Sequence, residues 1–332
     1  MSKLSIILPL RVTKEREEIL NQLSYIYLDS KMPDVIEFIV VDDGSIQKYA
    51  FEIELKCKEL EISYIYLNTQ EKDFSLARAR NNGAKNASSN LIMFQDIDMM
   101  PYDNYYNDLL NEINIQNILN NKKSFLMISS IYLTQEATNH YKAFNKQFLI
   151  DKMIINDSKY IEKFSTGTSL ILLNKEHFFN IGAYDENFVN WGHEDIDLNC
   201  RLILEDNFVK LPLDFLKDEK NFNNIYQYSG WKSIYRLYGD RTFLKGIVLF
   251  HAYHKTESDT DYYLNKKNNK SYFHQKIKIK IIEYKAKNNY IITTESILFD
   301  RYKFSLSKEN RLKCNSYFHL LLKKIKLKLT WI

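Results

Sequence analysis

Residues 76–98 read LARARNNGAKNASSNLIMFQDID, and this stretch decides the class of fold. Its first part, Leu76–Ala87, favours a helix, whereas Leu91–Phe94 is a run of four apolar residues that suits a buried strand. The strand ends at the acidic sequence Gln95-Asp96-Ile97-Asp98. A helix that leads directly into a short buried strand is typical of sheets whose strands run parallel.

The same alternation of strands and helices runs through the first part of the chain. Apolar runs predict strands at Leu4–Leu10, Phe38–Val41, Ile62–Leu67, Ser169–Leu173 and Ile247–Phe250. Helices are expected at Lys14–Leu28 and Phe51–Leu60. We therefore predict an α/β fold with a Rossmann-like, mostly parallel central sheet flanked by helices. Ligands of such sheets collect beyond the carboxyl ends of the strands.

Other segments are less regular. Residues 102–165 are expected to be mainly helical, and residues 205–245 are aromatic and irregular. Within the latter, Ser229–Trp231 and Tyr238–Asp240 each contain one of only eight glycines. This predicts a mobile loop over the ligand site expected at the carboxyl ends of the strands. Lys276–Ile281 reads KIKIKI and, by its strict alternation, predicts a strand.

The composition excludes several classes of protein. Of 332 residues, 45% are hydrophobic and 14% aromatic, so the chain can bury a core and is not broadly disordered. Cys57, Cys200 and Cys314 lie far apart without metal-binding spacing, which excludes a disulfide framework and a zinc site and fits a reducing compartment. With no run of about 20 apolar residues to span a membrane, a cytoplasmic protein is expected.

The basic residues are concentrated at the end of the chain. Residues 266–332 contain 17 Lys or Arg against 4 Asp or Glu, although the whole chain has a formal net charge of only +4. Apolar residues from Phe318 to Ile332 fall on one face of a helix, which predicts peripheral association with the inner face of the cytoplasmic membrane. The alternatives are a strand over Ile325–Trp331 and a solvated basic face. No nucleic-acid-binding module is recognisable, so no nucleic-acid partner is expected.

Two groups of residues suggest a metal site. Asp96 and Asp98 follow a buried strand, and carboxylates at this spacing can hold Mg²⁺ or Mn²⁺ together with the phosphates of a substrate. His251 and His254 follow another strand, and a neutral imidazole could complete the ligand shell. A lone D-x-D is common in loops; its position after a strand is what favours a metal site.

A third group is the sequence Trp191-Gly192-His193-Glu194-Asp195, with Asp197 two residues further on. Like charges this close raise the pKa of at least one carboxyl group, which suits a general base. The indole of Trp191 could stack on a sugar ring. Acidic residues also favour the N-terminus of a helix, and this second interpretation is compatible with the first.

Four blocks in order carry a family resemblance: LSIILPLR, FIVVDDGS, ARARNNGAKNASSNLIMFQDID and STGTSLILLNKEHFFNIGAYDENFVNWGHEDIDLNCRL. Together they resemble inverting nucleotide-sugar glycosyltransferases of family 2, which have a GT-A fold, and in particular galactosyltransferase-like and chondroitin-polymerase-like bacterial members. The resemblance implies a GT-A domain over residues 1–260, with a nucleotide-sugar half at about 1–100 and an acceptor half at about 101–260. Residues 261–332 would form a basic C-terminal extension that associates with membranes.

The resemblance implies a metal-dependent transfer of a hexose or N-acetylhexosamine from a UDP-sugar to a glycan hydroxyl, with inversion. The residues implied on the donor side are Pro9 and Arg11 at the uridine pocket, Asp42 or Asp43 on uracil or ribose, Arg80 near the diphosphate, and Asp96 on ribose or metal. Asp98 would bind Mn²⁺ or Mg²⁺, with His251 or His254 as the third ligand.

On the acceptor side, the resemblance makes Asp195 the catalytic base and places Glu194 beside it, binding the acceptor with Trp191, Gly192 and His193. His193 stands where many relatives have glycine, which leaves the donor-sugar or acceptor preference open. The acceptor would be a glycan or a lipid-linked glycan in the synthesis of a bacterial capsule, O-antigen or other surface polysaccharide. The alternative is a non-catalytic relative that binds nucleotide-sugars or glycans, against which the intact acidic residues argue.

Overall fold

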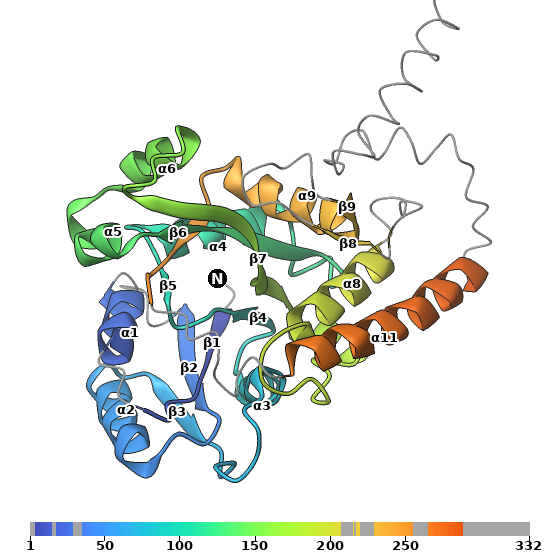
Figure 1. The fold of residues 1–332 in the computed structure, drawn as a ribbon, viewed down its shortest axis with the longest axis horizontal. Helices are drawn as coiled ribbons and strands as arrows, with labels where there is room; N and C mark the ends of the chain where they lie inside the picture. Colours follow the sequence, from blue (N-terminus) through green and yellow to red (C-terminus); the bar gives the residue numbers. More distant parts are fainter. Residues whose placement is uncertain are drawn as a thin grey trace, which may run out of the picture.

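The protein is built around one eight-stranded sheet, seen in a computed structural model (Figure 1). The structure describes residues 4–14, 18–28, 35–206, 215, 217–219, 229–254 and 265–287. The strand order is β3-β2-β1-β4-β7-β6-β10-β5. The strands are β1 (Leu4–Leu10), β2 (Ile36–Asp42), β3 (Ser63–Tyr66), β4 (Leu91–Phe94), β5 (Met99–Met100), β6 (Phe125–Leu133), β7 (Ile161–Asn174) and β10 (Val248–His251).

Strands β3, β2, β1 and β4 are mutually parallel, and β6 and β10 form a further parallel pair. Only β7 and β5 run against their neighbours. The prediction of an α/β fold with a mostly parallel sheet is therefore confirmed. A separate two-stranded sheet pairs β8 (Asp218–Glu219) with β9 (Ser229–Gly230).

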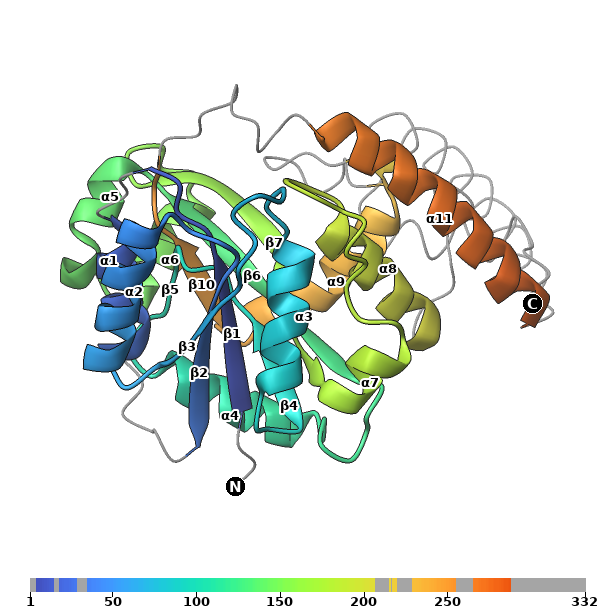
Figure 2. The same ribbon diagram turned by 90° about the horizontal axis from the view of Figure 1, so that it is seen from below.

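Helices cover both faces of the sheet (Figure 2). They are α1 (Glu18–Leu28), α2 (Gln47–Glu59), α3 (Leu76–Asn86), α4 (Tyr105–Ile115), α5 (Gln135–Asn139), η1 (Tyr141–Ala143), α6 (Lys146–Ile154), α7 (Lys175–Asn180), α8 (Glu194–Asp206), α9 (Trp231–Phe243) and α11 (Lys266–Lys287). Figure 2 shows α1 and α2 on one side of the sheet and α3 on the other. Among the described residues, we find no helix with the length and apolar character needed to cross a bilayer.

The core forms two apolar clusters, one on each face of the sheet. In β1, Ile6 and Leu8 belong to the cluster beneath α1 and α2, whereas Ile7 belongs to the cluster beneath α3. Successive side chains of a strand point to opposite faces, so a strand buried on both faces is apolar throughout. Helix α3 lies very close to β1, because a Cβ on Gly83 would come within 2.4 Å of Ile7. This tight contact sets how closely α3 packs on β1.

The prediction that residues 102–165 are mainly helical is wrong. Residues 102–165 contain helices α4, α5 and α6, but they also contain β6 and the first part of β7. Strand β6 is central and buried, yet Ser129 and Ser130 interrupt its apolar run. The Ser129 hydroxyl donates to the carbonyl of Gly239, so a polar residue in this strand serves tertiary packing that sequence periodicity does not reveal.

The irregular segment and the mobile loop are likewise corrected. Tyr238–Asp240 lies inside helix α9, and Ser229–Trp231 forms β9 and the first residue of that helix. Gly230 has a φ of +63° at the N-cap. A Cβ on Gly239 would come within 2.2 Å of the Thr166 side chain. These glycines therefore permit a sharp helix start and close packing of α9 on the sheet.

Helix α11 replaces the strand predicted at Lys276–Ile281. Phe273, Ile277 and Ile281 are buried at a spacing of four residues, whereas Ile279 is 58% exposed. The exposed isoleucine creates the alternation that imitated a strand. Figures 1 and 2 show α11 lying beside α8, against which it packs. The basic helix predicted at residues 318–332 lies outside the described residues.

Candidate active site

The carboxyl ends of β1, β2 and β4 meet at one edge of the sheet, because β1 pairs in parallel with both neighbours. Pro9 is opposite Val41, and Leu10 is opposite Asp42. Strand β4 ends at Phe94, so Asp96 follows at the same edge. The predicted donor-side residues are thus brought to a common edge of the sheet.

Asp42 and Asp43 are both fully buried at the end of β2. Asp42 accepts hydrogen bonds from the backbone N–H of Ser45 at 2.7 Å and from the Tyr64 hydroxyl at 2.8 Å. Burial raises the pKa of Asp42 above its ordinary value, although these hydrogen bonds act in the opposite direction. Gly44 adopts a φ of +85° and allows the chain to turn directly after the two acids.

Asp43 holds the loop that precedes α3. It forms an ion pair with Arg78 at 2.6 Å and accepts a hydrogen bond from the backbone N–H of Ser75 at 2.8 Å. Arg11 donates to the carbonyls of Gln70 and Lys72 at 2.9 and 2.8 Å. Arg11 and Asp43 therefore fix the same loop to the ends of β1 and β2, and this loop is one wall of the candidate site.

Asp98, His251 and His254 form a group whose ligand atoms all lie within 4.8 Å of one another. The Asp98 carboxylate is 3.4 Å from His251 Nε2 and 3.2 Å from His254 Nε2. Antiparallel pairing of β5 with β10 places His251 opposite Met99, the residue that follows Asp98. The sequence left open which histidine joins Asp98, and the structure brings both to it.

The carboxylate of Asp96 faces a different partner. Arg80 Nη2 donates to Asp96 at 2.9 Å, while Arg80 Nη1 donates to Glu194 at 3.0 Å. Ser169 donates its hydroxyl to the second oxygen of Asp96 at 2.6 Å. The Arg80 side chain is 1% exposed and lies 5.2 Å from the centre of the Tyr184 ring. Arg80 thus links Asp96 on the donor side to the start of α8.

Glu194 is a buried acid with an incomplete set of partners. Burial, and secondarily the charge of Asp195, raises the pKa of Glu194, although Arg80 opposes this shift. Its Oε2 atom is buried without a hydrogen-bond partner among the described residues. Tyr184, followed by the carboxylates of Asp96, Glu194 and Asp195, raises the pKa of Arg80 despite its burial, so the guanidinium stays charged.

Asp195 is the second residue of α8 and is partly exposed. Its Oδ1 accepts from the backbone N–H of Ile196 at 2.7 Å. Gly192 and His193 precede the helix with φ values of +103° and +77°, so the chain makes a left-handed turn into it. Acidic residues in the first turn favour the helix dipole, which agrees with the second interpretation of this segment.

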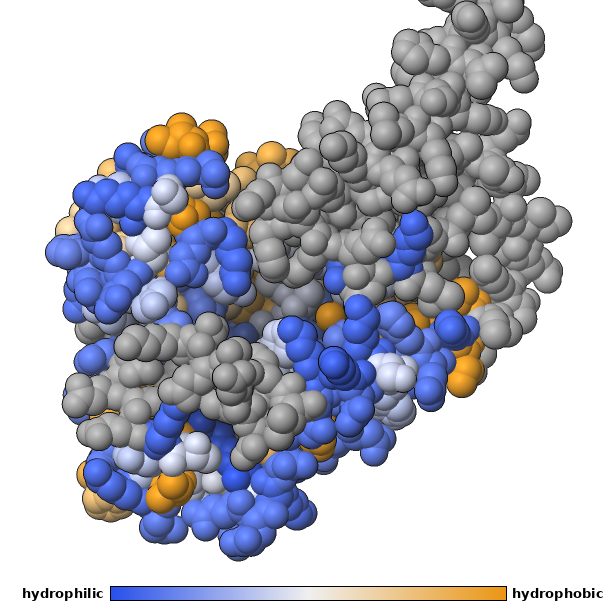
Figure 3. All heavy atoms as spheres, in the orientation of Figure 1, coloured by the Kyte–Doolittle hydropathy of each residue, from blue (hydrophilic) through white to orange (hydrophobic). Residues whose placement is uncertain are grey.

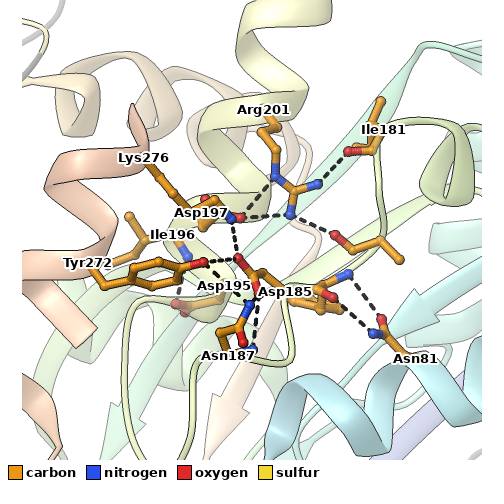
Figure 4. A network of polar contacts seen from close by, with 12 residues as sticks. Asn81, Ile181, Asp185, Asn187, Asp195, Ile196, Asp197, Arg201, Tyr272 and Lys276 are labelled. Carbon is orange, nitrogen blue, oxygen red and sulfur yellow. Dashed lines mark hydrogen bonds and ion pairs between the residues drawn. The ribbon is translucent and has the colours of Figure 1, made fainter. Parts of the chain in front are cut away.

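A polar network fixes the start of α8 to α11 (Figure 4). Lys276 of α11 forms ion pairs with Asp185 at 2.5 Å and with Asp197 at 3.0 Å. The Tyr272 hydroxyl also donates to Asp185 at 2.9 Å. Asp197 is further held by Arg201 at 2.8 Å. Helix α11 therefore supports the turn of α8 that carries Glu194 and Asp195.

Sequence reasoning missed several residues that shape the site: Arg78, Tyr132, Ser169, Tyr184 and Lys276. Residues two apart on a helix point in roughly opposite directions, about 200° apart, so Arg78 reaches Asp43 while Arg80 reaches Asp96. The pattern ARAR was a usable signal for this division. Tyr132, by contrast, stacks on His251 with ring centres 4.1 Å apart, and the sequence gives no sign of that contact.

The surface in Figure 3 is mostly hydrophilic and is hollowed near its centre. The charges of Asp98, Asp96 and Asp195 all raise the pKa of Tyr132, after burial as the main cause. Tyr132 therefore lies near enough to both the Asp98 group and the start of α8 for their charges to affect its hydroxyl. The arrangement can hold a divalent cation at one end and an accessible carboxylate at the other.

Comparisons with known proteins agree with the family expected from the sequence. A family model described as "Glycosyltransferase like family 2" matches residues 5–279. Chondroitin synthase of Pasteurella multocida (strain Pm70) is 25% identical over 237 residues, which are 63% of this chain and 24% of that protein. Validoxylamine A glucosyltransferase of Streptomyces hygroscopicus subsp. limoneus is 22% identical over 228 residues, which are 60% of this chain and 47% of that protein.

The chain thus spans about a quarter and about half of these two relatives. Among solved structures, GalNAc-T7 with UDP, GalNAc and Mn²⁺ aligns at 14% identity and a TM-score of 0.41, over 60% of this chain and 40% of that one.

Proposed function

The chain belongs to the glycosyltransferase-like family 2, whose model matches residues 5–279, and on this premise we propose that it transfers a hexose or N-acetylhexosamine from a UDP-sugar to a glycan hydroxyl. The observation that carries the proposal is the position of Arg80, which joins Asp96 at the donor edge of the sheet to Glu194 beside Asp195. Donor and acceptor chemistry would therefore meet around one buried cation.

The proposed metal ligands are Asp98, His251 and His254, whereas Asp96 is engaged by Arg80 and Ser169. One carboxylate and two imidazoles form a mixed oxygen and nitrogen set. Mg²⁺ prefers oxygen ligands, whereas imidazole suits transition metals, so this donor set supports Mn²⁺ over Mg²⁺. When bound, the cation would neutralise negative charge on the diphosphate of the donor.

Asp195 is the proposed general base. Its carboxylate is partly exposed, whereas Glu194 is buried and engaged by Arg80. Asp195 accepts the proton of the acceptor hydroxyl, and that oxygen attacks the anomeric carbon from the side opposite to UDP. The bond between the sugar and the diphosphate breaks as the new glycosidic bond forms, which inverts the anomeric centre. The buried Oε2 of Glu194 can accept a hydrogen bond from another hydroxyl of the acceptor.

The nucleotide would bind against the wall formed by Pro9, Arg11 and the Asp42–Asp43 pair. The carboxylate oxygens of Asp43 are engaged by Arg78 and by the backbone N–H of Ser75, so Asp43 shapes the loop. Contact with uracil or ribose would come from Asp42, Pro9 or Arg11. Trp191, Gly192 and His193 lie on the acceptor side, at the entrance to α8. The fixed positions of these groups lower the cost of bringing donor and acceptor together.

We place this reaction in the synthesis of a bacterial capsule, O-antigen or other surface polysaccharide, on a glycan or lipid-linked acceptor. The similarity to chondroitin synthase, a polysaccharide-forming protein by its name, supports this assignment. The division of the chain at residue 260 and membrane contact through residues 261–332 remain part of the proposal. Helix α11, within that extension, packs on α8 and so supports the site.

The Asp195→Asn variant tests the function. A general base contributes about 10²–10⁴-fold to rate, so UDP release in the presence of donor and acceptor should fall by that factor. UDP binding with Mn²⁺ should remain, measured by calorimetry. Glu205→Gln is the matched control, because Glu205 lies near the other end of α8 and is 44% exposed. Normal turnover by Asp195→Asn would refute the base assignment, and the wild type's failure to consume any UDP-sugar would favour the non-catalytic alternative.

A further inference from the structure

We propose that a pocket between α11 and the segment Asn187–Val189 binds a sugar unit of the acceptor glycan that lies some distance from the reacting hydroxyl. This inference rests on the proposed function and extends it by adding a second binding position for the acceptor. The pocket has a volume of about 410 Å³ and is lined by Asn187, Val189, Asn265, Asn268, Asn269 and Tyr272. Its size falls within the roughly 300–1,000 Å³ usual for small-molecule sites.

Two of the lining residues form fixed walls. Asn269 is buried and donates through Nδ2 to the carbonyls of Val189 and Trp191 at 2.9 and 3.2 Å. The Tyr272 hydroxyl is held by Asp185, which also binds Asn187 at 2.8 Å (Figure 4). The helix and the segment are therefore joined by side-chain hydrogen bonds that set the shape of the pocket.

The remaining polar groups are available to a ligand. No side-chain hydrogen bond joins Asn265 or Asn268 to another described residue, and Asn268 is exposed. Each amide offers two N–H donors and a carbonyl acceptor, a combination that matches the neighbouring hydroxyls of a sugar. The Tyr272 ring and Val189 supply apolar surface for its C–H groups. Amides beside an aromatic ring thus suit a carbohydrate better than a phosphate or an apolar ligand.

The pocket adjoins Trp191, a residue of the proposed acceptor site. Asn269 binds the carbonyl of Trp191, and the Lys266 ammonium lies 4.6 Å from the centre of the Trp191 ring. Trp191 is four residues before Asp195 in the chain. A glycan whose end reaches Asp195 could therefore cross Trp191 and place an earlier unit in the pocket. Lys266 beside this path favours a glycan that carries carboxylates.

The test uses the full chain and chondroitin oligosaccharides of increasing length as acceptors. The double variant Asn265→Ala/Asn268→Ala should raise KM for the longer oligosaccharides by about tenfold, the effect of losing two hydrogen bonds between neutral groups. Its kcat, and its KM for the shortest acceptor, should stay at wild-type values. Gln275→Ala is the matched control, because Gln275 is an exposed amide on α11 outside the pocket.

Direct binding separates this inference from the proposed function. Titration of the Asp195→Asn protein with the same oligosaccharides measures binding without turnover. Tighter binding of long oligosaccharides, weakened by the double variant and not by Gln275→Ala, supports the pocket even if no sugar is transferred. Equal binding of short and long oligosaccharides, no binding at all, or an unchanged affinity in the double variant overturns it.

Discussion

Asp96 and Asp98 are two residues apart, yet they belong to two groups built on opposite principles. Asp96 lies with Glu194 around Arg80, a buried side chain that supplies its own permanent positive charge. Asp98 lies with His251 and His254, whose imidazoles can be neutral and can act as metal ligands. One acid is paired with a cation of the protein itself, whereas the other belongs to the proposed metal site. The two halves of a D-x-D motif can therefore have separate tasks.

The topology of the sheet explains this division. Asp96 directly follows β4, whose neighbour β7 supplies Ser169, and α3 brings Arg80. Asp98 instead precedes β5, which pairs with β10, and these are the last two strands in the order of the sheet. The backbone N–H of Ala252 donates to the carbonyl of Asp98 at 2.8 Å and fixes this crossing. The chain between the two acids thus passes from one part of the sheet to another.

The largest expected effect on stability comes from removing Arg80, the cation that pairs with Asp96 and Glu194. Arg80→Met would leave Glu194 buried without its partner, and loss of one member of a buried ion pair costs about 3–5 kcal/mol. The free energy of unfolding, measured by chemical denaturation, should fall by this amount. Mn²⁺ binding should persist, since Arg80 contacts none of the three proposed ligands among the described residues.

The double variant Arg80→Met/Glu194→Gln is the control for this prediction. It removes the buried charge together with its partner, so it should recover a large part of the lost stability. If Arg80→Met unfolds at the wild-type denaturant concentration, the ion pair between Arg80 and Glu194 contributes nothing to the stability of the fold, and the structural role given to Arg80 is wrong.

The next largest effect is expected at the proposed metal site of Asp98, His251 and His254. Asp98→Ala should lower the transfer rate by about 100- to 1,000-fold, the loss seen when one electrostatic stabiliser of a reaction is removed. It should also weaken Mn²⁺ binding, measured by calorimetry in the presence of UDP. Asp98 is a partly exposed acid at the edge of the sheet, so the unfolding free energy should change less than in Arg80→Met.

His254→Ala should reproduce both effects of Asp98→Ala, and His140→Ala is the matched control because His140 is exposed and outside the group. Full Mn²⁺ affinity in both Asp98→Ala and His254→Ala would show that the metal binds elsewhere. We thus expect the group around Arg80 to govern stability and the group of Asp98, His251 and His254 to govern Mn²⁺ binding.

The sequence predicted those parts of the fold whose patterns are local. Strands β1 and β4 match their predicted bounds, because each is a single apolar run that ends at polar residues. Lys276–Ile281 was misread because the exposed Ile279 interrupts the true helical spacing of its buried neighbours. Strand β6 was missed because its serines are hidden in tertiary contacts rather than exposed.

The site shows the same limit. Motifs predicted Asp98, His251 and His254 as metal ligands, since residue type and position after a strand are visible in the sequence, and the structure brings the three together. Arg80 was a candidate and the ARAR spacing hinted at its direction, but Ser169 was not visible as a partner of Asp96, because it comes from a strand that meets Asp96 only after the sheet has formed. The role of α11 depended on Lys276, whose contacts with Asp185 and Asp197 span many residues. The sequence therefore suggested candidate residues, whereas the side chains that each acid contacts became known from the structure.

The smallest effect is expected from Ser169→Ala, which removes one of the two donors to Asp96. The hydroxyl donates at 2.6 Å, and a hydrogen bond to a charged group contributes about 1.5–3 kcal/mol to stability. Asp96 is partly exposed, so water can replace the lost donor while Arg80 keeps the other oxygen in place. The unfolding free energy should therefore fall by about 1 kcal/mol, measured by chemical denaturation, and Mn²⁺ affinity should not change. Because Arg80→Met also leaves Glu194 buried without its partner, its loss of stability should be far larger, and a Ser169→Ala effect of equal size would mean that this one hydrogen bond stabilises the fold as much as the buried ion pair does.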